Sequence, residues 1–298
     1  MISFMNRFLI AIALLSVVLR ATALQIPTQF KEAVAFVYAP LTATNAAPDG
    51  TGFFVGVPST KYTNVSAVYL VTAKHVLQDK NKCWRSHVFL RLNRHDGTLG
   101  WLLCPLSAAG TNKNVFIHPD AGVDLAVFGC APAQDTYDYT ILGDSLLTTK
   151  PLFKQLGIRE GTEVFFTGMF VNHLGTKRNL PLFRFGRVSL VSDEPVYFNG
   201  QFRDLYLIEA NSFGGNSGSP VYFITGYESP PGVSLAGSGT TSVLAGVLSG
   251  RFNDEADVIA VETGTKNATF PSLGITSVVP AYKLRELLYS DEVVAARQ

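Results

Sequence analysis

Short apolar stretches, each followed by turn-forming residues, recur through most of this chain. Their lengths are typical of β-strands, and the 26 glycines and 15 prolines supply the turns between them. The pattern therefore predicts an all-β protein, with strands near residues 33–38, 52–57, 68–72, 84–103 (a hairpin), 124–128, 162–166, 182–191, 205–208, 220–223 and 243–248. Residues 279–288 instead have the apolar spacing of a helix.

Residues 214–220, Gly-Gly-Asn-Ser-Gly-Ser-Pro, place one hydroxyl, that of Ser217, among residues that let the backbone turn tightly. The glycines leave no side chain between the main chain and an incoming carbonyl group, so the amides of Gly215 and Ser217 can converge on one oxygen. The apolar stretch from Pro220 to Phe223 predicts a strand that anchors this loop. Taken alone, a plain Gly/Ser turn between two strands explains the segment equally well.

Two further segments carry the groups that activate a serine. His75 follows the apolar stretch at residues 69–73, and Asp124 heads the stretch at residues 125–128, where a buried carboxylate needs a partner. A serine hydroxyl becomes a strong nucleophile when an imidazole takes its proton and a carboxylate orients that imidazole. We predict Ser217 as the nucleophile, His75 as the base and Asp124 as its orienting carboxylate, with an oxyanion hole formed by the amides of Gly215 and Ser217.

These segments, in the order His, Asp, Ser, resemble the motifs of the trypsin-like (chymotrypsin-fold) serine peptidases. Residues 215–220 match the Gly-x-Ser-Gly loop with its following small residue and proline. Residues 72–75 match the Thr-Ala step before the histidine, and residues 124–127 match the strand that begins with the aspartate. The resemblance implies two six-stranded antiparallel β-barrels of the chymotrypsin type with a C-terminal helix. Residues 24–140 would carry His75 and Asp124, and residues 141–298 would carry Ser217.

Asn216 takes the place where animal digestive members of the family have the aspartate that pairs with a newly cut amino terminus. In this respect the chain is more similar to the bacterial Do/HtrA-type and glutamyl-endopeptidase-type branches. We therefore expect its site to form without cleavage of a propeptide.

The resemblance also implies which residues bind substrate. The residue six before the serine lies at the base of the family's specificity pocket, and here Asn211 disfavours a preference for Arg or Lys. Ser249, Gly250 and Arg251 would lie on the strand that pairs with the substrate backbone, with Ser249 behind Asp124 and Arg251 at the pocket edge. A small or medium uncharged side chain is the expected substrate residue. An acidic one remains open, as does Arg251 being an ordinary exposed residue.

The first residues have the pattern of a secretory signal peptide. Arg7 precedes an apolar run at residues 8–19, and residues 21–23 give the small-x-small pattern of a cleavage site. The run is too short for a stable membrane anchor, for which about 20 apolar residues are needed. We predict a signal peptide over residues 1–23 and a secreted or periplasmic monomer; a buried amino-terminal helix is the alternative.

Charge and metal-ligand patterns exclude several classes of function. The 24 Lys and Arg nearly balance the 23 Asp and Glu, and no basic block would follow a phosphate backbone, so we expect no nucleic-acid partner. No spacing of Cys and His suggests zinc, and we predict neither a metal nor another cofactor. His118 and Asp120 are the nearest rivals for the catalytic roles, but their polar turn predicts solvent exposure.

Three cysteines, Cys83, Cys104 and Cys130, allow three pairings, each of which leaves one thiol over. Cys83 with Cys104 is the preferred pair, because the two lie in the strands of one predicted hairpin. Cys130 would then be a free thiol.

Together these features predict a secreted serine endopeptidase that hydrolyses peptide bonds of protein or peptide substrates through an acyl-enzyme. Two alternatives use the same residues. One is a binding protein that keeps the fold and has lost the chemistry, and the other is an esterase or amidase that acts on small molecules.

Overall fold

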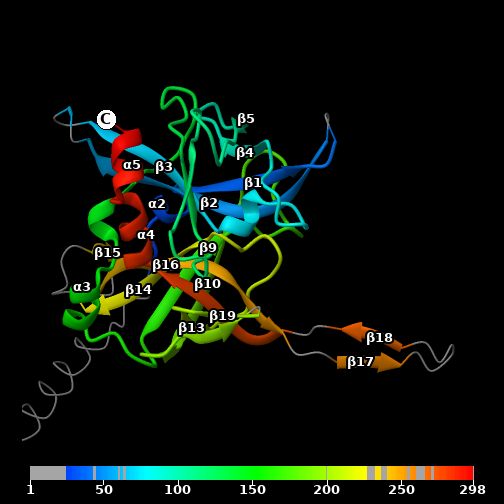
Figure 1. Cartoon of the computed structure of the whole chain (residues 1–298), viewed down its shortest axis with the longest axis vertical. Coiled ribbons are helices and arrows are strands. Elements are labelled where there is room, and N and C mark those ends of the chain that lie inside the picture. The colour runs from blue at the N-terminus through cyan, green and yellow to red at the C-terminus, as the bar shows by residue number, and fades with distance from the viewer. Residues whose placement is uncertain are drawn as a thin grey trace, which may run out of the picture.

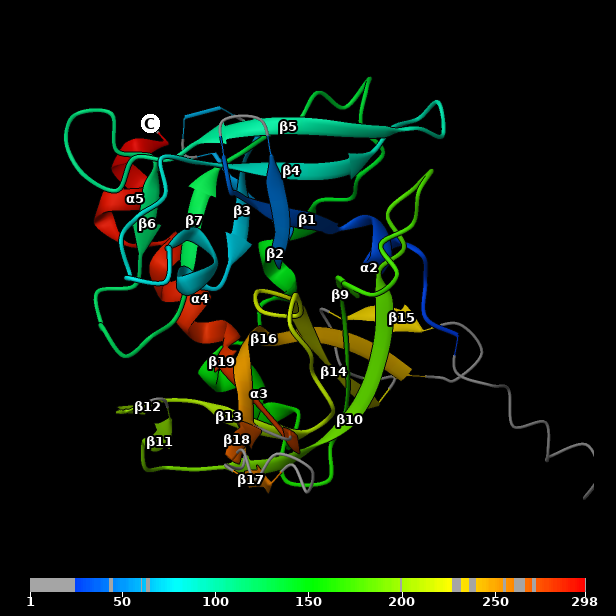
Figure 2. The same cartoon turned by 90° about the vertical axis from the view of Figure 1, so that its right-hand side faces the viewer.

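The computed structural model describes residues 25–42, 45–59, 61–62, 65–198, 200–226, 232–235, 240–253, 256–259, 266–269 and 272–297. Within them the protein is built mainly of antiparallel strands in two sheets, which lie one above the other in Figure 2. The predicted all-β fold of the chymotrypsin type is confirmed. The predicted signal peptide, residues 1–23, lies outside the described residues.

The first sheet follows the order β5-β4-β1-β2-β3-β7-β6, and the short β8 pairs with β2. Its strands are β1 Val34–Pro40, β2 Ala46–Pro58, β3 Ser66–Thr72, β4 His87–Asn93, β5 Leu99–Pro105, β6 Val115–Ile117, β7 Ala126–Gly129 and β8 Leu142–Gly143. The central strands β1, β2 and β3 have buried, Val- and Phe-rich stretches, as expected for strands that are covered on both faces.

The second sheet closes into a barrel of six strands, β14-β9-β10-β13-β19-β16, because β16 also pairs with β14. β15 extends this sheet at β16. The strands are β9 Glu163–Gly168, β10 Leu182–Val191, β13 Tyr206–Glu209, β14 Pro220–Gly226, β15 Val233–Leu235, β16 Thr240–Asn253 and β19 Ser272–Pro280. Closure leaves these six strands without a free edge.

Two separate hairpins, one labelled in Figure 1 and both in Figure 2, and a few short helices complete the described part of the chain. The hairpins are β11 Val196–Phe198 with β12 Gln201–Arg203, and β17 Ala256–Ile259 with β18 Lys266–Thr269. The helices are α2 Gln29–Glu32, η1 Lys74–Leu77, η2 Asp144–Leu146, α3 Lys150–Gln155, α4 Ala281–Leu288 and α5 Asp291–Ala296. The predicted C-terminal helix is therefore confirmed as α4, and α5 follows it.

The largest apolar cluster joins the two sheets. Phe53 and Val71 of the first sheet belong to it together with Phe165 and Tyr222 of the second, and Leu284 of α4 is also a member. Burial of such side chains contributes about 1.5–3 kcal/mol each. The two sheets thus share a core, which fixes the residues of one sheet relative to those of the other.

The C-terminal helices α4 and α5 lie beside the first sheet and form polar contacts with residues on either side of β6. Figure 2 shows α4 and α5, in red, beside β6 and β7. Glu286 of α4 accepts a hydrogen bond from His118 Nε2 at 3.0 Å, and Glu292 of α5 forms an ion pair with Lys113. His118 is buried, so the predicted exposure of its turn was wrong for this side chain. Its second nitrogen accepts from the Asp120 backbone N–H at 3.1 Å, and the ring therefore has a structural partner on each side.

All three cysteines are free, so the predicted Cys83–Cys104 disulfide was wrong. The hairpin itself is confirmed, but its register pairs Cys104 with Val88, five positions beyond Cys83. Cys83 lies in the preceding turn, where its backbone N–H donates to Asp79 Oδ1 at 2.9 Å. The neighbour of Cys104 is instead Cys130, whose thiol, together with burial, raises the pKa of the Cys104 thiol.

No helix among the described residues is both long enough and apolar enough to cross a bilayer.

Candidate active site

His75 and Asp124 meet at the ends of two paired strands of the first sheet. β3 ends at Thr72, and the single turn η1 that follows carries His75 and buries its neighbours Val76 and Leu77. Asp124 lies two residues before β7. The Nδ1 atom of His75 is 2.7 Å from Asp124 Oδ2, and the His75 backbone N–H donates to Asp124 Oδ1 at 3.0 Å. Both groups of the predicted pair are therefore held in one orientation.

A third donor to Asp124 comes from the second sheet. The Ser249 hydroxyl, on β16, donates to Asp124 Oδ2 at 2.7 Å, as the family resemblance implies. The carboxylate is 6% exposed, and three donors replace the water that burial removes. Burial raises the pKa of Asp124, but the hydrogen bond and positive charge of His75, followed by the bond from Ser249, lower that pKa to about 2.

The imidazole of His75 has one bound edge and one open edge. Its side chain is 49% exposed although Nδ1 is bound to Asp124. Partial burial lowers the pKa of His75, but the hydrogen bond and charge of Asp124 outweigh it, so the pKa lies above its usual value. The Asp124 contact occupies Nδ1, which leaves Nε2 as the nitrogen that can exchange a proton with a reacting group.

At two positions of the Ser217 loop, the backbone has a conformation that glycine adopts readily and other residues rarely do. Gly215 has φ of +92° and Gly218 has φ of +86°, both in the left-handed region. A Cβ atom on Gly218 would collide with the Thr51 carbonyl oxygen and the Thr72 hydroxyl. β14 begins at Pro220, so the loop is anchored directly to the barrel.

Asn216 holds this loop without any ionic partner. Its buried side chain accepts from the Phe213 backbone N–H at 2.8 Å and donates to the Met169 carbonyl at 2.7 Å. These two neutral hydrogen bonds hold the Asn216 side chain in place. That the loop forms without a newly cut amino terminus stays a prediction.

Thr51 of β2 joins the first sheet to the Ser217 loop through two hydrogen bonds and to Met169 through a third. Its backbone N–H donates to the Ser217 carbonyl at 2.8 Å, and its hydroxyl donates to the Gly215 carbonyl at 2.7 Å. The same hydroxyl accepts from the Met169 backbone N–H at 2.9 Å. Thr51 stands in no motif and was not predicted to support the site. Its position between Gly50 and Gly52 on an apolar strand is the only sequence feature that indicates a close backbone approach there.

The amides of Gly215 and Ser217 have no hydrogen-bond partner within the described part of the chain. Buried or half-buried N–H groups are normally paired. Two uncommitted donors therefore lie on one loop; Ser217 lines the cavity and the buried Gly215 does not, so the oxyanion hole stays a prediction.

The Ser217 hydroxyl and the His75 ring line the same cavity, which has a volume of about 540 Å³. Asp124, Ser249, Gly250 and Arg251 line it too. The Ser217 hydroxyl donates to the Ser249 carbonyl at 3.5 Å, and no hydrogen bond joins it to the His75 ring among the residues described. Catalytic hydrogen bonds are often long or misaligned without substrate and tighten when it binds.

Other residues that line this cavity were not identified from the sequence. They come from η1 and the residues after it, from the turn before Asp124 and from the β11–β12 hairpin: Lys74, Gln78, Lys82, Ala121, Gln201 and Arg203. Apart from Lys74, which precedes His75 in its motif, none of them stands in a recognisable motif. Only the tertiary fold brings the β11–β12 hairpin to the turn near Asp124, where a Cβ on Gly122 would lie 3.3 Å from the Phe202 carbonyl oxygen.

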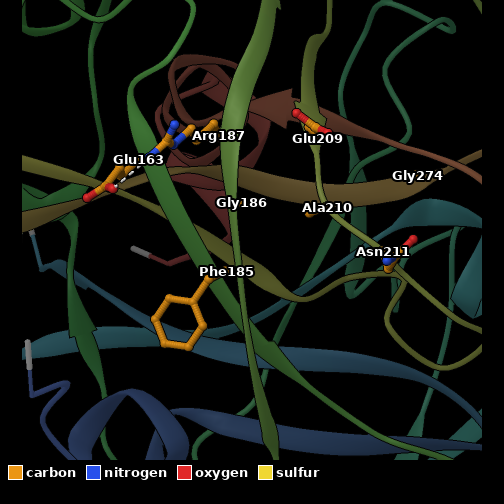
Figure 3. A pocket seen from close by; sticks show the side chains of 8 residues that line it. All are labelled: Glu163, Phe185, Gly186, Arg187, Glu209, Ala210, Asn211 and Gly274. Carbon is orange, nitrogen blue, oxygen red and sulfur yellow. Dashed lines mark hydrogen bonds and ion pairs between the residues drawn. The ribbon is translucent and has the colours of Figure 1, made fainter.

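Asn211 faces a different hollow of about 490 Å³, on the surface of the second barrel (Figure 3). It lines that hollow together with Phe185 and Gly274, and the Glu163–Arg187 ion pair lies at its other end. Asn211 does not line the cavity of Ser217 and His75. A substrate-binding role for Asn211 stays a prediction.

No cluster of three or more His, Cys, Asp or Glu side chains that could hold a metal ion occurs among the described residues.

Comparisons with known proteins give distant likenesses in structure alone. No protein-family model matches the chain, and no curated protein matches it by sequence. The MamO protease domain from Magnetospirillum magneticum is similar at 16% identity and a TM-score of 0.48, over 88% of this chain and 98% of that one. An inactive form of a serine-to-alanine mutant of Rv3671c from M. tuberculosis H37Rv is similar at 15% identity and a TM-score of 0.42, over 93% and 98%.

An inactive form of the Rv3671c protease is similar at 15% identity and a TM-score of 0.39, over 90% of this chain and 96% of that one. At these values none of the three likenesses bears on the chemistry of this chain.

Proposed function

We propose that this protein is a serine endopeptidase that cuts peptide bonds through an acyl-enzyme. The observation that carries the proposal is the buried Asp124 carboxylate, which binds His75 Nδ1 at 2.7 Å and directs the free edge of the imidazole into the cavity of Ser217. A buried, fully hydrogen-bonded charge that orients a titratable group beside a hydroxyl is typical of a nucleophilic site.

Each residue has a defined task in the proposed reaction. His75 Nε2 accepts the Ser217 proton as the serine oxygen attacks the carbonyl carbon of the peptide bond. The amides of Gly215 and Ser217 donate to the oxyanion that develops, and each such donor lowers the barrier by about 3 kcal/mol. His75 then gives the proton to the leaving amine. Water attacks the acyl-enzyme with His75 as the base again, while Asp124 stays charged throughout.

We also propose that the protein acts outside the cytoplasm as a monomer, after removal of residues 1–23. Residues 24–140 and 141–298 would be its two halves. The shared core supports a cleft of fixed shape between them, because side chains of both sheets pack in one apolar cluster.

Ser217→Ala tests the proposal. The change removes one partly exposed oxygen and no packing, so the fold should persist while peptide cleavage falls by about 10⁴-fold or more and labelling by a fluorophosphonate probe disappears. Ser219→Ala is the matched control: its hydroxyl is buried without a hydrogen-bond partner, and its loss should leave both signals near those of the parent.

The two alternatives give different results in the same assay. A parent protein that neither labels nor cleaves any member of a peptide library would be a binding protein on this fold. One observation favours the binding protein: the Ser217 hydroxyl contacts the Ser249 carbonyl at 3.5 Å and not the His75 ring. A parent that labels and hydrolyses small esters but no peptide would be an esterase.

A further inference from the structure

The cavity of Ser217 and His75 carries an unbalanced positive charge. Four cationic side chains line it, those of Lys74, Lys82, Arg203 and Arg251, against the single carboxylate of Asp124. That carboxylate is 6% exposed and is already bound to His75 and Ser249. Among the described residues that line the cavity, a ligand therefore meets cations and no available anion.

None of the four cations forms an ion pair with a side chain in the described residues. The acidic groups nearby are engaged elsewhere: Asp49 pairs with Arg85 at 3.2 Å, and Asp79 and Asp120 accept from backbone N–H groups of their own turns. The Lys74 ammonium group donates to two carbonyls of the turn before Asp124. Within the described residues the positive charge of the cavity is therefore balanced only in part, by Asp124 and by the negative field of Asp120 at Lys74.

Arg251 lies two residues after Ser249 on β16, on the same barrel as Ser217. Its Nη1 atom donates to the Ser212 carbonyl at 3.2 Å, which orients the guanidinium group. A guanidinium group has five N–H donors, and this bond uses one of them. The rest can bind a carboxylate at two points, a geometry that a flexible ammonium group does not offer.

Arg203 reaches the cavity from the β11–β12 hairpin. Its Nε atom is buried and has no hydrogen-bond partner among the described residues, so a ligand can reach only the two terminal amino groups of the guanidinium. The ring of Phe198 lies 5.8 Å from its guanidinium carbon and 4.6 Å from the ring of Phe252 on β16. Phe198 therefore holds the hairpin against the strand that carries Arg251.

We propose, granted the peptidase function above, that this cleft selects peptides with an acidic side chain close to the scissile bond, and that Arg251 and Arg203 bind its carboxylate. A charged hydrogen bond of this kind changes affinity by about 10- to 100-fold. Because the cavity is open to solvent, the preference weakens as ionic strength rises.

The test compares fluorogenic peptides that differ only by Glu or Gln at one position, scanned along the peptide. The parent should cleave the Glu peptide about 10- to 100-fold faster in kcat/KM at one or more positions next to the cut. Arg251→Gln and Arg203→Gln should each reduce that ratio to less than about threefold, and because the ratio is taken within one variant, a general loss of activity cancels from it. Arg159→Gln, which removes an exposed cation that lines none of the cavities described here, should leave the ratio unchanged.

Two outcomes overturn the proposal: equal cleavage of Glu and Gln peptides at every position, or a preference for Glu that survives in both variants. Arg251→Glu gives a second check that does not depend on a loss, because it should transfer the preference from Glu to Lys at the same position.

A binding measurement distinguishes the proposed acidic selectivity from the proposed peptidase function. Fluorescence anisotropy with Ser217→Ala protein should show the Glu peptide bound about 10-fold or more tightly than the Gln peptide, whether or not the parent cleaves either of them. Cleavage without a charge preference would refute the acidic selection alone. Charge-selective binding without cleavage or labelling would refute the peptidase and keep the acidic ligand.

Discussion

Two hollows of similar size on this molecule differ in how their charges are held. The hollow of Figure 3 has about 490 Å³ and the cavity of Ser217 about 540 Å³. In the first, Glu163 and Arg187 form an exposed ion pair at 3.5 Å, an arrangement that contributes about 0–1 kcal/mol. In the second, the Asp124 carboxylate is buried and receives three hydrogen bonds. Volume alone therefore does not distinguish a reactive site.

The same comparison applies to the hydrogen-bond donors. Beside the Ser217 cavity, the amides of Gly215 and Ser217 are uncommitted, while the neighbouring carbonyls of the loop are held by Thr51. Two carbonyls of the loop are thus hydrogen-bonded, while these two N–H groups are not, within the described part of the chain. A site that must stabilise a developing negative charge needs this asymmetry, because its donors have to be oriented before the reaction starts.

Asp124→Asn should have the largest effect on cleavage, and it tests whether the two hollows differ in function. The substitution keeps the size of the side chain but removes the charge that orients His75 and stabilises its protonated form. Peptide cleavage should fall by about 10⁴-fold in kcat. Glu163→Gln, which removes a carboxylate from the hollow of Figure 3, should change kcat by less than about twofold and serves as the control. Comparable losses in both variants would show that the two hollows do not differ in function.

A smaller effect is expected from Thr51→Val, which keeps the shape of a fully buried side chain and removes its hydroxyl. The Gly215 carbonyl and the Met169 N–H then lose their partner, and the loop that presents the oxyanion donors is less well held. We expect kcat to fall about 10- to 100-fold with KM little changed, and Thr51→Ser to restore kcat.

Thr167→Val is the matched control for Thr51. Thr167 is equally buried, but its hydroxyl has no hydrogen-bond partner, so the same substitution should leave kcat near the parent value. A loss of thermal stability in Thr51→Val without any change in kcat would mean that Thr51 supports the fold and does not position the loop.

The sequence was sufficient for the parts of the site that stand in local patterns. Ser217, His75 and Asp124 each adjoin an apolar strand, and the glycines around Ser217 are required by the two positive φ angles. Most of the longer strands were predictable for the same reason, since burial patterns and turn residues are local properties. The nine-residue β19 of the closed barrel and the short β6, β8, β11, β12, β15, β17 and β18 were not predicted. The β4–β5 hairpin is an example, being correct in position although its disulfide was wrong.

What the sequence did not reveal depends on contacts between distant segments. Thr51 and Met169 meet across 118 residues, and nothing near either residue indicates the other. Arg203 enters the cavity because Phe198 packs on β16, a contact between two elements that share no motif. The buried position of His118 depends in the same way on Glu286, a residue of α4 that lies 168 positions further along.

The smallest effect we predict concerns the pH dependence of cleavage. His75 must be neutral to accept the Ser217 proton, so kcat/KM falls as pH decreases through the pKa of His75 in the free protein. Because the contact with Asp124 outweighs partial burial and raises this pKa, the midpoint of the acid limb should lie above pH 6.5. Asp49, which adds a weaker negative field at His75, provides a way to adjust it.

Asp49→Asn should lower the pKa of His75 by removing that field and so move the acid limb of kcat/KM to lower pH, while the plateau rate stays the same. The shift should shrink as salt is added, because the interaction reaches through partly solvated space. Asp135→Asn, which removes an exposed carboxylate between β7 and β8 of the first sheet, should leave the limb in place. If the limb moved equally in both variants, or in neither, the field of Asp49 would not act on the base, and Asp124 alone would set its proton affinity.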